Sequence, residues 1–100
     1  MIEVKIILYE DNVRHEWGKK IFPKYDDDFV IEVIKYFHSW DVYHSQDLQM
    51  DKHDNCKLIF HMDVNQVEED NIMTEYKEDL EISFDNKEDY NNFLKVVSQF

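Results

Sequence analysis

The chain has 100 residues, the usual size of one domain, and 43% of them are hydrophobic, including seven Phe, six Tyr and two Trp. This supply of core residues excludes an intrinsically disordered acidic chain, although the net charge is −12. The single cysteine excludes an internal disulfide, and no apolar run suits a secretory signal or a membrane span, so we expect one cytoplasmic domain over residues 1–100.

Two strands are predicted to open the chain as a β-hairpin. Residues 2–9 alternate between apolar and polar side chains, which is typical of a half-buried strand. Asp11-Asn12 predicts a turn, and residues 14–22 return as a second strand that ends at Pro23. The inward face of the first strand is expected to carry Ile2, Val4, Ile6 and Leu8.

A helix is predicted to follow the hairpin. Asp26-Asp27-Asp28 favours a helix start, because Asp is a good N-cap and acids in the first turn suit the helix dipole. Phe29, Val33 and Phe37 then recur at helical spacing, so the helix is expected to run to about Ser39. Residues 41–55 are polar and hard to assign, although residues 42–44 could form a short extended piece.

The second half of the chain predicts two more strands and a second helix. Residues 57–64 and 80–85 both alternate, with Leu80, Ile82 and Phe84 inward in the later strand. Residues 65–79 are compatible with a loop, a short helix or an irregular strand. Asp85 or Asn86 caps the final helix, whose buried stripe consists of Tyr90, Phe93, Leu94 and Val97.

This order of elements predicts an α+β fold. We expect a mainly antiparallel sheet of about four strands, with an opening β-hairpin, and two amphipathic helices packed on one face. The hairpin followed by a helix resembles the start of a β-grasp, ubiquitin-like fold, although the final helix does not fit that pattern. A resemblance of topology implies no function.

The charge is distributed unevenly along the chain. Residues 1–24 carry five basic and four acidic residues, whereas residues 25–100 carry six Lys and nineteen acids. An acidic face repels nucleic acid and anionic membranes and attracts basic protein surfaces. The predicted partner-binding residues are the acids of the densest tract: Glu68, Glu69, Asp70, Glu75, Glu78, Asp79, Glu81, Asp85, Glu88 and Asp89.

Part of this tract suggests a mimic of nucleic acid. Glu81 and Asp85 are expected on the solvent side of one strand, with Ser83 between them, and same-face residues of a strand lie about 6.6 Å apart. Such a row of carboxylates could imitate backbone phosphates and block a groove that binds nucleic acid through Lys and Arg. The alternative is a solvated acidic surface that only keeps the protein soluble.

Metal binding and catalysis have weaker support. His44, Asp47, Asp51, His53, Asp54, Cys56, His61 and Asp63 are possible ligands, but their spacing matches no zinc or EF-hand template. No nucleophile and base stand in a recognisable context, and one glycine cannot build a phosphate-binding loop. We therefore expect no metal, no cofactor and no enzymatic activity.

Aromatic residues cluster around the first helix and its end. Tyr25, Tyr36, Trp40 and Tyr43 are typical of interface anchors if they are exposed. They are equally compatible with sealing the ends of a small core. The sequence alone leaves both interpretations open.

The leading hypothesis is a small acidic inhibitor of a basic, nucleic-acid-processing protein. In size, acidity and composition the chain is similar to phage and mobile-element anti-defence proteins such as anti-CRISPRs, although no segment matches a named family. One alternative is an immunity protein that neutralises a nuclease toxin. Others are a non-catalytic adaptor, which would expose an apolar patch, and a metal-dependent enzyme or sensor.

Overall fold

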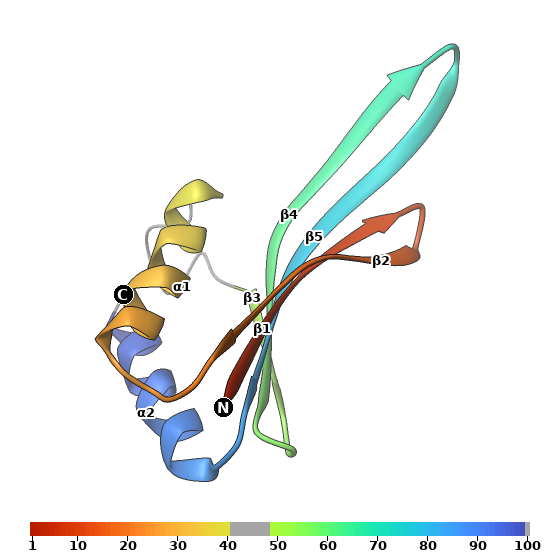
Figure 1. Cartoon of the computed structure of the whole chain (residues 1–100). Helices are drawn as coiled ribbons and strands as arrows, with labels where there is room; N and C mark the ends of the chain where they lie inside the picture. The colour runs from red at the N-terminus through yellow and green to blue at the C-terminus, as the bar shows by residue number, and fades with distance from the viewer. Residues whose placement is uncertain (41–48, 100) are drawn as a thin grey trace.

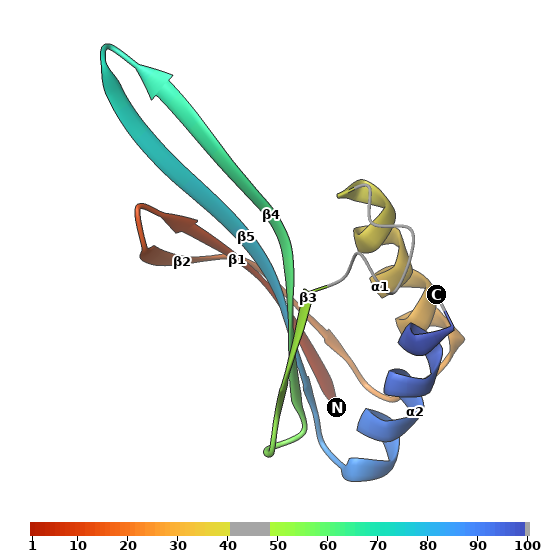
Figure 2. The ribbon, with the colours of Figure 1, turned by 180° about the vertical axis from the view of Figure 1, so that it is seen from behind.

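The computed structural model describes residues 1–40 and 49–99, which form an α+β fold with one antiparallel sheet (Figures 1 and 2). The sheet has the order β2-β1-β5-β4-β3, and each of these neighbouring pairs is antiparallel. The elements are β1 (Ile2–Glu10), β2 (Val13–Phe22), α1 (Asp27–Ser39), β3 (Gln49–His53), β4 (Lys57–Glu69), β5 (Ile72–Phe84) and α2 (Lys87–Ser98).

The predicted fold class is confirmed, but the strand count is too low. The described residues form five strands where about four were expected, because β3 was not recognised. The likeness to the start of a β-grasp fold goes no further than β1, β2 and α1. The extended piece predicted at residues 42–44 lies outside the described part of the chain.

Two hairpins close with the same dipeptide in the same unusual backbone conformation. Asp11 and Asn12 have φ values of 48° and 70°, and Asp70 and Asn71 have values of 52° and 65°. Two-residue hairpin loops with two positive φ angles are type I′ turns, in which Asn and Asp are the best tolerated residues after glycine. The first turn was predicted, whereas the second lies in the segment whose structure the sequence left open.

Both helices begin within the short segments predicted to open them, and the structure selects Asp26 and Asn86 as the N-caps. Asp26 Oδ1 accepts a hydrogen bond from the backbone N–H of Phe29 at 3.0 Å, and Asn86 Oδ1 accepts one from Asp89 at 2.8 Å. Each bond satisfies a backbone donor that would otherwise be unpaired in the first helical turn.

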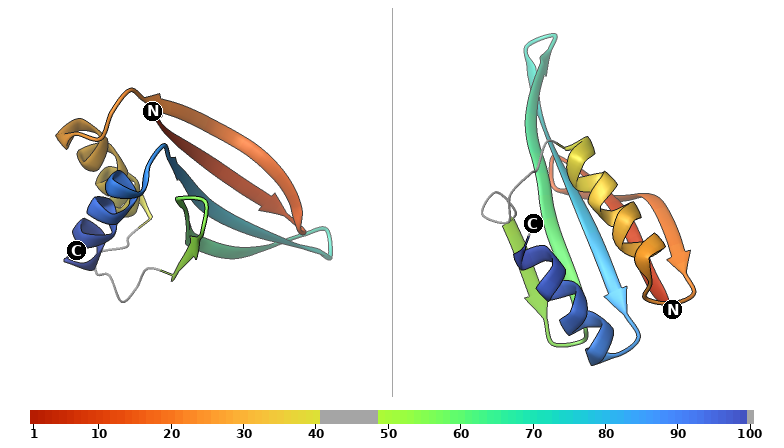
Figure 3. Two further views of the ribbon diagram at one scale, coloured as in Figure 1. Left: turned by 90° about the horizontal axis from the view of Figure 1, so that it is seen from below. Right: turned by 90° about the vertical axis from the view of Figure 1, so that its left-hand side faces the viewer.

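The two helices cover one face of the sheet (Figure 3). Phe93 of α2 lies at the centre of the core between the two layers, with ring centroids 5.3 Å from Phe29 of α1 and 5.7 Å from Phe84 of β5. Its ring is also 6.2 Å from that of Phe60 on β4. Contacts of this kind fix the helices against the sheet.

The apolar face of β1 differs from the prediction in its second half. Ile2 and Val4 are buried beneath the helices, but Ile6 and Leu8 are only half-buried, because they lie where the helical layer ends. Ile7 points to the opposite, helix-free face and is nevertheless fully buried. That face must therefore be covered by side chains of the sheet itself.

Strands β4 and β5 extend well beyond the body of the molecule as a two-stranded ribbon (Figure 1). Their pairing continues to Glu69 and Ile72, whereas β1 pairs with β5 only as far as Tyr76, and β3 pairs with β4 only as far as His61. We call residues 64–75 the arm. The arm accounts for much of the 49 Å length of a fold whose other dimensions are 24 and 23 Å.

The two helices have 13 and 12 residues. Neither of these described helices has the length and apolar character needed to cross a bilayer.

Candidate partner-binding surface

The ten acids predicted to bind a partner do not form one surface. Glu78, Asp79 and Glu81 lie in the part of β5 that belongs to the central sheet. A second group lies on the arm, and a third surrounds the start of α2, so the three groups must be considered separately.

Glu81 is buried, and its predicted exposure to solvent is wrong. Its carboxylate lies 3.1 Å from the guanidinium of Arg14 on β2 and 3.6 Å from Nζ of Lys57 on β4, and its side chain is only 7% exposed. Alternation along β5 does place Glu81 on the helix-free face. Arg14 of β2 and Lys57 of β4 then cover its carboxylate, so Glu81 cannot contribute to a row of phosphate-like charges.

Asp79 is buried on the same face and holds a histidine. His61 Nδ1 lies 2.9 Å from Asp79 Oδ1, and His61 Nε2 lies 2.6 Å from Asp51 Oδ2. Both ring nitrogens face carboxylate oxygens, so both donate when the ring is the charged imidazolium. The hydrogen bond to Asp51, with the contribution of Asp79, raises the pKa of His61 against the opposing effect of burial.

Further ion pairs complete this layer of the helix-free face. Lys5 lies 3.2 Å from both Glu3 and Glu16, and Lys19 lies 3.4 Å from Glu3. The pairing of cations and acids makes this face electrically balanced instead of acidic. It also explains the burial of Ile7, which these long side chains can cover.

The acids around the start of α2 are partly engaged in local structure. Asp85 pairs with the N-terminal ammonium group of Met1. Asp89 Oδ2 accepts a hydrogen bond from Asn86 Nδ2 at 3.1 Å, which reinforces the helix cap. Glu88 is exposed in the first turn, where an acid favours the helix dipole.

The arm carries the remaining acids and no basic residue. Glu68, Glu69 and Asp70 are exposed near the tip, and Glu75 lies near the base, 3.5 Å from Lys77 just outside the arm. Large apolar side chains are exposed between these acids, namely Val64 (62%), Val67 (42%), Ile72 (66%) and Met73 (55%). In the sequence, the hairpin that presents these apolar residues is marked by its turn, Asp70-Asn71, which lies between the two predicted strands at residues 57–64 and 80–85.

The strand register places acids and apolar residues on both faces of the arm. Glu69 and Ile72 pair across the ribbon on one face, and Glu68 and Met73 pair on the other. Each face therefore offers a carboxylate beside an apolar side chain. Such mixed surfaces can combine charge attraction with apolar contact.

The possible metal ligands that the structure describes do not come together. Among the described residues, no three His, Cys, Asp or Glu side chains are arranged to hold a metal ion. Cys56 is a free thiol in the turn before β4, with a positive φ of 60°. His44, Asp47 and the side chain of Asp63 lie outside the described part of the chain.

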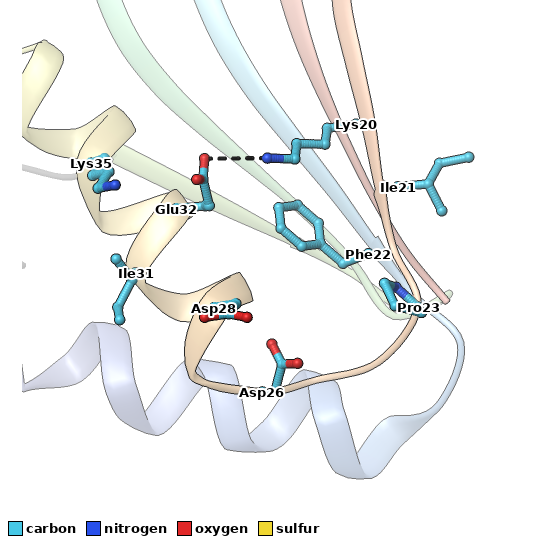
Figure 4. A pocket seen from close by; sticks show the side chains of 9 residues that line it. All are labelled: Lys20, Ile21, Phe22, Pro23, Asp26, Asp28, Ile31, Glu32 and Lys35. Atoms are coloured by element: carbon cyan, nitrogen blue, oxygen red, sulfur yellow. Dashed lines mark ion pairs between the residues drawn. The ribbon is translucent and has the colours of Figure 1, made fainter.

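A hollow of about 450 Å³ lies between the edge of β2 and α1 (Figure 4). Lys20 pairs with Glu32 across it at 3.5 Å and also lies 5.1 Å above the ring of Phe22. Its exposed apolar walls include Ile21 and Ile31. Lys20 is already engaged by Glu32 and Phe22, and the charged residues Asp28 and Lys35 of the lining are exposed to solvent. The described lining therefore offers no buried charged group that would select a ligand.

The aromatic residues around α1 are used in two ways. Tyr25 and Tyr36 are partly buried against the core, in keeping with sealing its ends. Trp40 packs against Tyr36, with ring centroids 6.1 Å apart, and its indole N–H donates to Glu78 of β5. Tyr43 lies outside the described residues. Trp17 of β2, which the sequence does not place in this cluster, is 67% exposed.

Comparisons with protein-family models, with curated proteins and with solved structures each gave no match.

Proposed function

We propose that the protein is a small non-catalytic inhibitor that binds a basic surface of a nucleic-acid-processing protein, with the arm as its contact element. The single observation that carries this proposal is the arm itself. Twelve residues project from the core with four carboxylates, no basic residue and four exposed large apolar side chains.

The arm is well suited to enter a groove that normally holds nucleic acid. Proteins bind nucleic acid largely through Lys and Arg contacts to phosphates, so such a groove attracts carboxylates. Exposed charges act over about 8–10 Å at physiological ionic strength, which favours rapid encounter. The apolar residues between the acids then supply contact area that a solvated acidic surface would lack.

This proposal relies on fewer acids than the sequence suggested. Glu81 and Asp79 are buried in ion pairs, so we assign them to the stability of the fold. The contact is proposed to depend on Glu68, Glu69 and Asp70 at the tip. An immunity protein against a nuclease toxin would use the same contact, and the identity of the partner distinguishes the two roles.

A second candidate function is that of a non-catalytic adaptor. The exposed apolar side chains of the arm favour the adaptor role, since a structural subunit needs an apolar contact surface. These side chains are Val64, Val67, Ile72 and Met73. In that role the arm would bind a partner that is not basic. The binding would then resist salt, which separates this candidate from the inhibitor.

The experiment that tests the proposal is a pull-down from a lysate of the source cells at low and high salt, with mass spectrometry of the eluted proteins. The test variant neutralises the tip of the arm by Glu68→Gln, Glu69→Gln and Asp70→Asn. A control variant changes the net charge equally on the body by Asp28→Asn, Asp54→Asn and Glu88→Gln, which are exposed acids.

The proposal predicts a nucleic-acid-binding protein that is retained by the wild type and the control variant, and lost by the arm variant or at high salt. Addition of DNA or RNA should displace it. Equal recovery by the arm variant would reject the arm as the contact. A salt-resistant partner without a nucleic-acid function would favour the adaptor.

A further inference from the structure

A cleft lies on the helix-covered side of the sheet, between the end of α1 and the base of the arm. Trp17 is the extra residue of a β-bulge in β2, because Ile6 pairs with Gly18 and Ile7 pairs with Glu16. The bulge displaces Trp17 from the regular alternation of the strand. Its indole is 67% exposed and forms a wall shared by two hollows.

The opposite wall contains a carboxylate held by a second tryptophan. The indole N–H of Trp40 donates to Oε2 of Glu78. One hollow, of about 290 Å³, is lined by Ile6, Trp17, Trp40 and Glu78. The other, of about 220 Å³, is lined by Leu8, Trp17, Asn65, Tyr76 and Glu78.

The chemistry of these walls favours a cation. Among the residues that the structure describes, Glu78 is the only ionisable acid or base in either lining besides the phenol of Tyr76, and it forms no ion pair with any of them. Aromatic faces attract cations through their ring quadrupole, most strongly in the case of tryptophan. A carboxylate beside them adds a charged hydrogen-bond acceptor.

The size of the hollows favours one side chain over a whole small molecule. Pockets that hold drug-sized ligands usually measure about 300–1,000 Å³, and these hollows, of about 290 and 220 Å³, lie at or below the lower end of that range. A guanidinium is planar, remains charged and stacks on aromatic faces while it donates to a carboxylate. These properties match an indole wall beside Glu78.

We propose that this cleft binds the guanidinium of an arginine side chain, stacked on Trp17 and paired with Glu78. The proposal rests on the proposed function in one respect, since the basic partner would supply the arginine. Asn65 and Tyr76 connect the cleft to the base of the arm. A partner seated on the arm would therefore bring its side chains close to the cleft.

The two tryptophans provide a direct test, because the chain contains no others. The full-length protein is labelled with ¹⁵N, and its two indole N–H signals are followed by NMR at constant ionic strength. The probe is N-acetyl-arginine methylamide, and the matched neutral control is the citrulline analogue. Both indole signals should shift in a saturable way with the arginine probe, with a dissociation constant in the millimolar range, about 1–10 mM.

Variants separate the cleft from the general acidity of the protein. Glu78→Gln keeps an oxygen that can accept from Trp40 and removes the charge, so it should weaken arginine binding about tenfold. Trp17→Leu should weaken it as well, as read from the remaining Trp40 signal. Glu88→Gln makes the same chemical change at an exposed position of α2 and should leave probe binding unchanged.

The proposal is overturned if neither signal shifts saturably, if the citrulline analogue acts equally, or if Glu78→Gln binds as the wild type does. Failure of the proposed function is distinguishable from this outcome. Arginine binding at the cleft together with a pull-down that yields no basic partner would leave the cleft established and reject the inhibitor.

Discussion

The carboxylate of Glu81 lies 3.1 Å from the guanidinium of Arg14, a residue 67 positions earlier in the chain. The pair connects β5 to β2 across β1, and Lys57 approaches the same carboxylate from β4 at 3.6 Å. Strands β2 and β4 thus each place one cation against a buried acid of β5. The pair therefore contributes to the cohesion of the sheet, which gives Glu81 a structural role.

Reversing this charge should destabilise the protein. Glu81→Lys places a third cation between Arg14 and Lys57, so we expect the melting temperature to fall by roughly 10 °C. The matched control is Glu88→Lys, which changes the net charge equally at an exposed position and should have little effect. Thermal unfolding followed by circular dichroism measures both. Equal melting temperatures for the two variants would contradict the role of Glu81.

The core centred on Phe93 predicts a larger effect. Phe93→Ala should lower the free energy of unfolding by about 3–5 kcal/mol, because the ring is fully buried between the helices and the sheet. Ile31→Ala on the exposed side of α1 should change it by less than about 0.5 kcal/mol. Urea unfolding gives both values. A small effect of the Phe93 variant would mean that α2 packs differently.

The environment of His61 predicts a pH dependence of stability. Asp51 and Asp79 raise the pKa of His61 in the folded state, so the protonated ring stabilises the fold fully below its unfolded pKa of about 6.5. This stabilisation is lost as the pH rises through the higher, folded pKa. Melting temperatures between about pH 5.5 and 8.5 should therefore decline with rising pH.

His61→Gln should flatten part of that decline. General charge repulsion also falls at lower pH, so the exposed His15→Gln variant serves as the control for it. NMR titration of the His61 ring proton measures its pKa directly. A His61 pKa at or below the ordinary histidine value of about 6.5 would contradict the proposed contact of its ring with both carboxylates.

The positive φ angles of the hairpin turns predict a specific response to alanine. Asn12→Ala should destabilise the protein by about 1 kcal/mol, because alanine tolerates a φ of 70° less well than asparagine. Asn91→Ala makes the same chemical change at an exposed position of α2, where alanine favours the helix. The denaturant concentration at the midpoint of unfolding should thus fall for Asn12→Ala and rise for Asn91→Ala.

The sequence predicted best the elements whose signals are local. The helices begin within the predicted segments, with Asp26 and Asn86 as caps, and the Phe29 and Phe93 stripes face the core as expected. Strand β3 was missed because Met50 is its only large apolar residue. The sequence does not assign a secondary structure to the arm, because its apolar residues face solvent on both sides and show no alternation toward a core.

The candidate site was harder to predict than the fold. Alternation assigns Glu81 to the outer face of β5, but burial there depends on Arg14 and Lys57 from other strands. The cleft at Trp17 likewise depends on a bulge, which appears only when the register of β1 and β2 is known. Both features result from long-range pairing that no short segment of the sequence encodes.

The base of the arm is bonded to the first hairpin, since Glu75 N–H donates to Asp11 Oδ1 and Asp11 N–H donates to the Glu75 carbonyl, each at 2.9 Å. From residue 66 to residue 74, β4 and β5 pair only with each other, so the reach of the arm beyond its base is independent of the core. Each cross-strand pair adds one rung of about 3.4 Å to the ribbon, and the Asp-Asn turn can close it at any rung. Adding or deleting rungs two at a time would preserve which side chains share a face. The length of the arm can thus change while the rest of the fold stays the same. Selection can then match that length to the depth of a partner's groove.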